Sequence, residues 1–258
     1  MSSSHLEYGV EEQAAQWIDH DKGRSIAAIQ SNYIPWIGYF DIINAVDEFV
    51  FIDDVQYTRR DWRNRNRIRS LGGGSQWLTI PVLVKGRYTQ RIDETVVSDG
   101  SWAQRHWQTL QQAYHAAPYF RHYEDRVREA YHVAESLNKL SDINRHFIEL
   151  CCSLLEIDTP IRWSTEFTTE SERNARLIGL CTALDARQYL SGPSAKEYLD
   201  ADAFATVGTE IRYADYSAYQ RYDQVHEGFD PAVTVLDPIF NLGNGAQSLL
   251  LTRRGKHG

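Results

Sequence analysis

The segment from Ser25 to Asp54 constrains the fold of this 258-residue chain more than any other. Residues 25–30, SIAAIQ, have the composition of a buried strand, and residues 36–46, WIGYFDIINAV, that of a helix with Pro35 in its first turn. A second apolar run at 48–52, EFVFI, ends on Asp53 and Asp54. A strand, a helix and a second strand in about 28 residues predict a β–α–β unit with parallel strands.

The rest of the chain continues this alternation of strands and helices. We therefore expect an α/β fold, with a mostly parallel sheet flanked by helices and a helical insertion or cap around 101–156. Residues 1–24 are expected to form an N-terminal extension, with an amphipathic helix near 9–19, before a single α/β domain over 25–258. Helix N-caps are expected at Ser141 or Asp142, and a capping box at Thr169 and Glu172. The remaining strands are expected at 76–84, with Pro81 favouring an edge, and at 161–164, 187–190 and 210–213, and the remaining helices at 101–117, 123–137, 142–156, 171–184 and 193–199.

Charge and composition exclude several classes of protein. Lys and Arg number 27 against 35 Asp and Glu, so the net charge of −8 argues against a general nucleic-acid binder. The N-terminus has no apolar signal region and no stretch is long enough for a membrane span, so we expect a cytoplasmic protein. The three cysteines, Cys151, Cys152 and Cys181, predict buried thiols rather than a disulfide framework. The oligomeric state stays open.

Residues 59–69 form the densest polar feature of the sequence. Their six Arg and one Asp give +5, which leaves −13 on the remainder of the chain. Guanidinium groups match phosphate or carboxylate, so the segment predicts binding of a phosphate-bearing donor, an RNA end included; a solvated loop paired with acids is the alternative. In an extended strand, successive side chains face opposite sides, so about three of the arginines would reach one ligand. The binding candidates here are Arg60, Trp62, Arg63, Asn64, Arg65 and Asn66.

Polar side chains also follow the predicted strands at their carboxyl ends, where α/β sheets bind ligands. Asp53 and Asp54 suit a general base, a ribose contact or Mg²⁺ with a nucleotide, although Asp54 could instead pair with an arginine. His106 is the third catalytic candidate, and packing within a helical face is its alternative role. No zinc site is expected, because the histidines lack metal-ligand spacing. Further binding candidates are Gln30, Asn32, Tyr33, Trp36, Gln56, Tyr57, Ser191, Gly192 and Lys196.

The first strand-to-helix loop has the layout of the nucleotidylyl transferases. Residues 36–39, WIGY, keep the spacing of their HxGH motif, although both histidines are missing. Gly38 would permit close backbone approach, and the helix N-terminus favours an anion. The turn SGPSAK at 191–196 similarly offers backbone N–H groups and Lys196 to a phosphate or carboxylate, or is a plain helix cap.

The ordered motifs together resemble one known family. They are IQSNYIPWIGYFDIIN, EFVFIDDVQYTRRDWRNRNRI, QWLTIPV with Lys85 and Gly86, the Trp102–Trp107 stretch, APYF, YLSGPSAKEYLD and FDPAVTVLDPIFNLG. From about Ser25 to Gly243 they closely resemble the WbqC-like protein family. The resemblance implies a bacterial enzyme associated with O-antigen or other surface-glycan gene clusters, or with secondary metabolism. It supplies no established catalytic residue.

Three functions are compatible with these residues. The first, which we favour, is a biosynthetic transferase that moves an acyl or aminoacyl group from a phosphate-bearing donor to an amine of an amino sugar or related metabolite. Asp53, Asp54 or His106 would then be the general base. The second is nucleotidylyl transfer or adenylate formation with Mg²⁺. The third is a non-catalytic module that binds a nucleotide sugar.

Overall fold

A computed structural model describes residues 17–252 and contains a five-stranded parallel sheet. The strand order is β5–β2–β1–β6–β7, and every neighbouring pair is parallel. The predicted α/β class and the initial β–α–β unit are therefore confirmed. The strands are β1 Ser25–Ile29, β2 Glu48–Phe51, β5 Ile161–Trp163, β6 Gln188–Ser191 and β7 Glu210–Tyr213.

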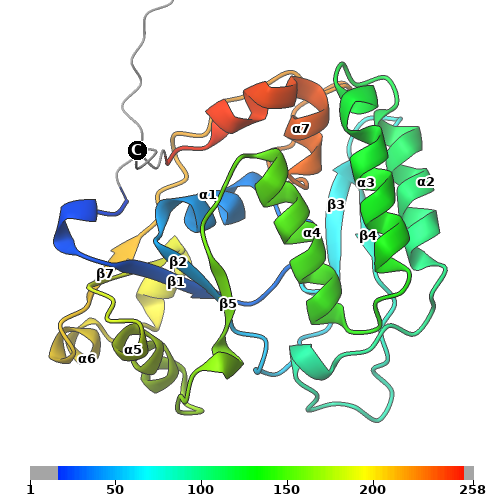
Figure 1. Ribbon diagram of the computed structural model, residues 1–258. Helices are drawn as coiled ribbons and strands as arrows, with labels where there is room; N and C mark the ends of the chain where they lie inside the picture. Colours follow the sequence, from blue (N-terminus) through cyan, green and yellow to red (C-terminus); the bar gives the residue numbers. More distant parts are fainter. Residues whose placement is uncertain (1–16, 253–258) are drawn as a thin grey trace, which may run out of the picture.

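Alternate strand residues build two cores on opposite faces of this sheet. Ile26 and Val50 pack with α5 (Arg173–Ala183) and α6 (Ala201–Thr206) on one face. Ala27 and Phe49 face the other side, which is covered by α1 (Ile37–Ala45). Figure 1 shows α1 on one side of the sheet and α5 and α6 on the other. The period-2 alternation of the strands thus sets both layers.

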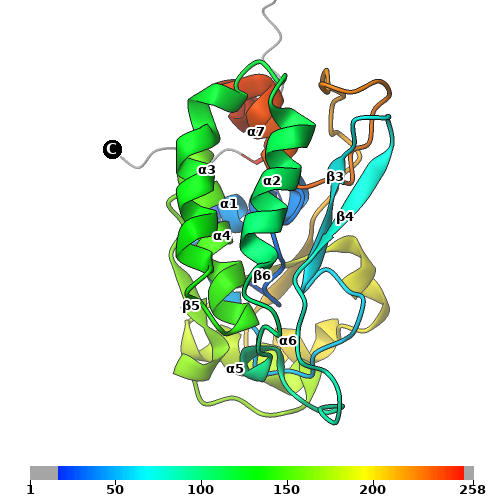
Figure 2. The same ribbon diagram turned by 90° about the vertical axis from the view of Figure 1, so that its right-hand side faces the viewer.

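The helical insertion is an integral layer rather than a detached cap. It consists of α2 (Trp102–Tyr114), α3 (Phe120–Ala134) and α4 (Leu140–Leu154), which lie beside an antiparallel hairpin of β3 (Arg65–Arg69) and β4 (Ser75–Thr79) (Figures 1 and 2). The last helix, α7 (Leu236–Leu242), packs near the end of α3. Their buried side chains belong to the same hydrophobic core as α1.

Several predicted details of the elements are wrong. The strand expected at 76–84 ends at Thr79 and pairs with the arginine segment, outside the parallel sheet. α1 begins at Ile37, so Pro35 precedes its N-cap. The segment 193–199 forms only a 3₁₀ turn over Pro193–Glu197, and the sequence pattern did not indicate α6 or α7.

The predicted helix caps also shift. Lys139 occupies the N-cap of α4, while the Ser141 hydroxyl binds Asp53 instead of the helix end. Glu172 caps α5 by accepting a 2.8 Å hydrogen bond from the backbone N–H of Ala175, so the box at Thr169 does not form. Ser141 therefore binds a residue distant in the sequence instead of capping its own helix, and Glu172 is itself the N-cap instead of the third residue of a capping box.

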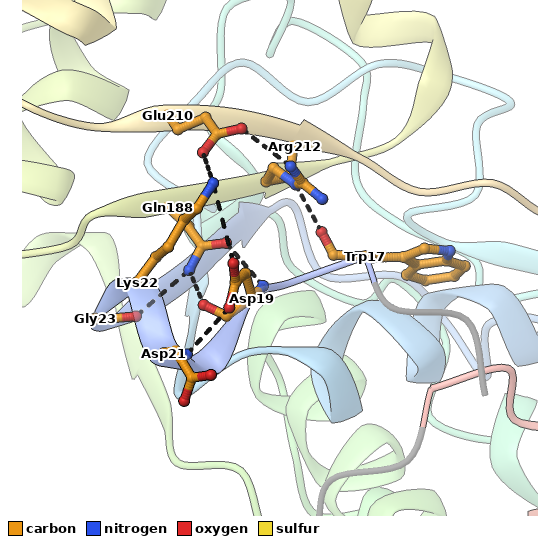
Figure 3. Close-up of polar contacts among 8 residues, drawn as sticks. All are labelled: Trp17, Asp19, Asp21, Lys22, Gly23, Gln188, Glu210 and Arg212. Carbon is orange, nitrogen blue, oxygen red and sulfur yellow. Dashed lines mark hydrogen bonds and ion pairs between the residues drawn. The ribbon is translucent and has the colours of Figure 1, made fainter. Parts of the chain in front are cut away.

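Residues 17–24 of the expected N-terminal extension pack against the parallel sheet. They cross the amino ends of the strands, where Asp19 and Gln188 exchange hydrogen bonds of 2.9 and 2.6 Å (Figure 3). Arg212 donates to the carbonyl of Trp17 at 3.0 Å, and the Trp17 side chain is buried. Most of the helix expected at 9–19 falls outside the described residues, and residues 20–22 form a 3₁₀ turn.

Candidate functional site

A cavity of about 620 Å³ lies at the carboxyl ends of β1, β2 and β6. β1 leads to β2 on one side, whereas β6 lies on the other side of β1, so the strand order reverses there. Ligands of open α/β sheets bind at such a reversal. We call this the sheet-edge cavity. Its polar lining includes the predicted residues Gln30, Gln56, Ser191 and Gly192, and also Ser194, Arg173 and Arg176.

Two arginines give the sheet-edge cavity its positive charge. Arg173 and Arg176 lie in the first turn of α5, where the helix dipole also favours an anion. Arg176 Nη2 is 3.5 Å from Asp54 Oδ2, and Arg173 lies over the ring of Tyr198 at 4.5 Å. Among the described residues, Arg176 pairs with a carboxylate and Arg173 does not, so the site retains a positive charge for an incoming anion.

An aromatic wall closes the other side of this cavity. The rings of Trp36 and Tyr216 meet edge-on at 4.9 Å, and Tyr39 donates its hydroxyl to the carbonyl of Gln30 at 3.0 Å. A Cβ atom on Gly38 would lie 2.3 Å from the Trp36 ring. The Trp36 indole therefore fills the space beside the Gly38 backbone, where the sequence predicts an anion.

A second cavity, of about 290 Å³, adjoins the first at Trp36. Its lining is mostly apolar, and we call it the tryptophan slot. Arg63 connects the polar rims of the two cavities, since it donates to Gln30 Oε1 at 3.0 Å and to the side-chain oxygen of Asn32. The slot is lined by Asn32, Pro35, Trp36, Trp62, Asn66, Pro231 and Ala232.

Asn66 holds the loop that carries Trp36. Its amide donates to the carbonyls of Tyr33 and Ile34 at 3.1 and 2.8 Å. Ile34 has φ 36°, a left-handed conformation that is costly for a β-branched residue. This strained backbone turns the chain so that the next residues line both cavities.

The two adjacent aspartates have different environments. Asp53 is 1% exposed and accepts hydrogen bonds from the Ser31 N–H and hydroxyl and from the Ser141 hydroxyl at 2.6–2.8 Å. Burial raises the pKa of Asp53, and these hydrogen bonds oppose the rise. Asp54 is partly exposed, accepts a hydrogen bond from Ser164 and pairs with Arg176, which lines the sheet-edge cavity. The geometry therefore favours Asp54 over Asp53 for chemistry.

Magnesium does not fit this pair of aspartates as they stand. The Asp53 carboxylate already accepts three hydrogen bonds, and Asp54 has a hydroxyl and a guanidinium as partners. Over residues 17–252, no three His, Cys, Asp or Glu side chains gather into a group that could hold a metal ion.

His106 lies in the core of the helical layer, away from both cavities' linings. Its Nδ1 is 2.9 Å from the Tyr33 hydroxyl, which is 2.6 Å from that of Tyr131. Trp102 packs edge-on against the imidazole at 5.2 Å. Burial lowers the pKa of His106 to about 4, so the ring is neutral near pH 7. A packed, hydrogen-bonded role fits these contacts.

Some arginines of the 59–69 segment bind other parts of the protein, and others are exposed at the surface. β3 places Arg65, Arg67 and Arg69 on one face, as the alternation predicted. Arg69 is buried and donates to the backbone carbonyls of residues 226–228, and Arg67 pairs with Asp230 at 3.4 Å. Neither guanidinium is open to a ligand at the cavities.

The other predicted binding residues lie outside the linings of the two cavities. Tyr33 and Tyr57 are buried, and Asn64 donates to the carbonyl of Ile80 at 2.8 Å. The Lys196 ammonium lies 5.2 Å from the Tyr213 ring centre. Arg60 and Arg65 likewise line neither cavity.

Sequence reasoning missed the two cavity arginines. Arg173 and Arg176 are three residues apart, so they share one helix face just after the strand exit at Ser164. That spacing was the available signal, but the denser arginine run at 59–69 obscured it. The prediction of buried cysteines is confirmed for all three, and burial raises the pKa of Cys152 and Cys181 to about 12.

Comparisons with known proteins place the chain among relatives. A model of the WbqC-like protein family matches residues 30–248. "Uncharacterized protein Rv1507c" of Mycobacterium tuberculosis is 43% identical over 227 residues, which cover 88% of this chain and 97% of that protein. No solved structure matches. In residues 17–252, no helix has the length and apolar character to cross a membrane.

Proposed function

The chain belongs to the WbqC-like protein family, and from that premise we propose that it is a biosynthetic transferase with a phosphate-bearing donor. The donor binds in the sheet-edge cavity, and an acyl or aminoacyl group moves from it to an amine. The observation that carries the proposal is the pair Arg173 and Arg176 at the strand-order reversal, where the first turn of α5 also faces the cavity.

The tryptophan slot holds the acceptor in this proposal. An amino sugar has apolar ring faces that pack on indoles and hydroxyls that bind amides, and the slot offers Trp36, Trp62, Asn32 and Asn66. Trp36 belongs to both cavities, so two ligands would meet across it. The setting is surface-glycan or secondary-metabolite biosynthesis in the cytoplasm.

Asp54 is the general base of the proposed transfer. The acceptor nitrogen bonds to the carbonyl carbon of the donor, and Asp54 takes the proton that the nitrogen loses. The bond to the leaving sulfur or oxygen breaks, and the proton passes to that atom. The Asp54 carboxylate lies 3.5 Å from the guanidinium of Arg176, and Arg176 lines the sheet-edge cavity where the donor binds in this proposal.

Binding and transfer are tested separately. Calorimetry with acetyl coenzyme A, ATP and UDP-N-acetylglucosamine is expected to find one ligand whose Kd rises about tenfold or more in Arg176→Ala. Arg105→Ala is the matched control, because Arg105 is an exposed, paired arginine on α2. Binding of no ligand, or the same Kd in Arg173→Ala and Arg176→Ala as in wild type, would contradict the donor site.

Transfer is followed by mass spectrometry of an amino-sugar acceptor. Asp54→Asn is expected to lower kcat about 100-fold or more with an unchanged donor Kd, because it removes the base and keeps the shape. An unchanged kcat would exclude Asp54 as base. Donor binding without any acyl gain would instead support the non-catalytic nucleotide-sugar module.

Nucleotidylyl transfer or adenylate formation is the second candidate. Strand order reverses beside β1, as in dinucleotide-binding sheets, and WIGY begins at the N-cap of α1. This reaction predicts consumption of ATP or CTP with release of pyrophosphate. A preparation that transfers acyl groups but releases no pyrophosphate would exclude it.

A further inference from the structure

A cationic and aromatic surface lies beside the two cavities. We call it the arginine–aromatic rim, and its members come from the loop before β3, from the β3–β4 hairpin and from the loop after β4 (Figure 2). Gln56 and Thr58 of the first loop line the sheet-edge cavity, and Trp62 lines the tryptophan slot. The rim consists of Arg59, Arg60, Trp62, Arg65, Trp77, Lys85, Arg87 and Tyr88.

Three aromatic side chains of the rim are exposed to solvent. Trp62, Trp77 and Tyr88 have 41%, 44% and 73% of their surface accessible. Trp62 and Trp77 are 5.3 Å apart, and Arg65 lies over Trp77 at 4.2 Å. Arg59 lies 5.5 Å from the Tyr88 ring centre. Exposed rings with guanidinium groups over them are the platforms on which nucleobases stack in single-strand binding sites.

Within residues 17–252, the cations of the rim also form no ion pair. In the part of the chain that the structure describes, Arg59, Arg60, Arg65, Lys85 and Arg87 form no ion pair with a carboxylate, and Asp61 is engaged by Thr58 and Arg63. Arginines elsewhere, such as Arg105, Arg128 and Arg145, do form ion pairs. The rim is therefore a local positive surface on an acidic protein.

We propose that the arginine–aromatic rim binds the single-stranded end of a polynucleotide. Bases would stack on Trp77 and Tyr88, while the backbone phosphates meet Arg60, Arg65 and the cations of the 85–87 loop. A polyanion without bases would pair with the cations but could not stack on the exposed rings. The bases of a duplex are stacked on one another and are not free to stack on the protein. The inference rests on this surface, so it stands independently of the transferase proposal.

The complete chain is titrated into a fluorescent 12-nucleotide RNA with an unpaired CCA end, and anisotropy is measured at several salt concentrations. Neutralising three to five phosphates predicts a slope of log K against log salt of about −2 to −3.5. Trp77→Ala is expected to raise the Kd about tenfold or more, and Trp77→Phe to restore much of the affinity. Arg60→Glu is the second variant, since Arg60 is exposed, with Arg128→Glu on α3 as its matched control.

The competitors distinguish base stacking from simple charge attraction. Equal binding of an RNA duplex or a sulfated heparin fragment would overturn the proposal, as would unchanged affinity in both Trp77→Ala and Arg60→Glu. Arg176→Ala is expected to leave RNA binding unchanged, because Arg176 lies in the sheet-edge cavity. Loss of small-donor binding in that variant with intact RNA binding supports both assignments, whereas absence of RNA binding overturns this one alone.

Discussion

Polar side chains gather both at the amino ends of the parallel strands, which we call the amino edge, and at their carboxyl ends, the carboxyl edge, but in very different settings. At the amino edge, hydrogen bonds join Asp19 to Gln188, Glu210 to Arg212 and Arg212 to the carbonyl of Trp17 (Figure 3). At the carboxyl edge, polar groups surround a cavity of about 620 Å³. The comparison shows that polarity at strand ends marks a site only where the chain leaves space for a ligand.

Asp53 is an exception to this comparison. It lies at the carboxyl edge, but its carboxylate is buried and hydrogen-bonded to protein groups, as the polar groups of the amino edge are. Asp53→Ala leaves the hydroxyls of Ser31 and Ser141 without their buried acceptor, so we expect the free energy of unfolding to fall by about 3–5 kcal/mol. Urea denaturation measures this loss, with exposed Asp158→Ala as the control. A loss below about 1 kcal/mol would show that Asp53 is not part of the structural network.

His106 lies outside both edges, and its pH response tests the assignment of a buried structural role. The folded pKa of about 4 is below the unfolded value of 6.5, so protonation favours unfolding. The stabilisation is complete above about pH 6.5 and is lost as pH falls toward 4, where the loss reaches about 3 kcal/mol.

We therefore expect wild type to lose more stability between pH 7 and 4 than His106→Gln does. Urea denaturation at each pH gives the difference, and exposed His115→Gln is the matched control that keeps the wild-type profile. Parallel curves for wild type and His106→Gln would mean that the imidazole titrates normally and is open to solvent.

The contrast between the edges also explains what the sequence could and could not predict. Continuous apolar runs predicted β1 and β2, because strands of a parallel sheet are buried on both faces, and the strand-exit rule predicted Gln30, Gln56, Ser191 and Gly192. It could not separate Asp53 from Asp54, because their difference depends on Ser141, 88 positions away in the chain. The sequence likewise could not tell the roles of Arg69 and Arg176 apart. Arg69 donates to the backbone carbonyls of residues 226–228, whereas Arg176 lines the cavity.

At the amino edge, Gln188→Ala tests how much the hydrogen bonds between Gln188 and Asp19 stabilise the packing of residues 17–24 on the sheet. The side chain is fully buried and satisfies both the N–H and the carbonyl of Asp19. We expect a loss of about 1–2 kcal/mol, measured by urea denaturation, with little change in donor Kd. Exposed Gln104→Ala on α2 is the control, and a weakened donor Kd would contradict the separation of the two edges.

Lys22→Ala is expected to have the smallest effect. Lys22 Nζ lies 3.3 Å from Glu210 Oε2, but the two side chains are 53% and 46% exposed. Water screens such a pair and ordering both side chains costs entropy, so we expect a change below about 0.5 kcal/mol that decreases further in 1 M salt. A loss as large as that of Gln188→Ala would mean that the ion pair, rather than the buried amide, holds residues 17–24 on the sheet. Because Glu210 also binds Arg212 at 3.0 Å, the remaining contact keeps the carboxylate paired when Lys22 is removed.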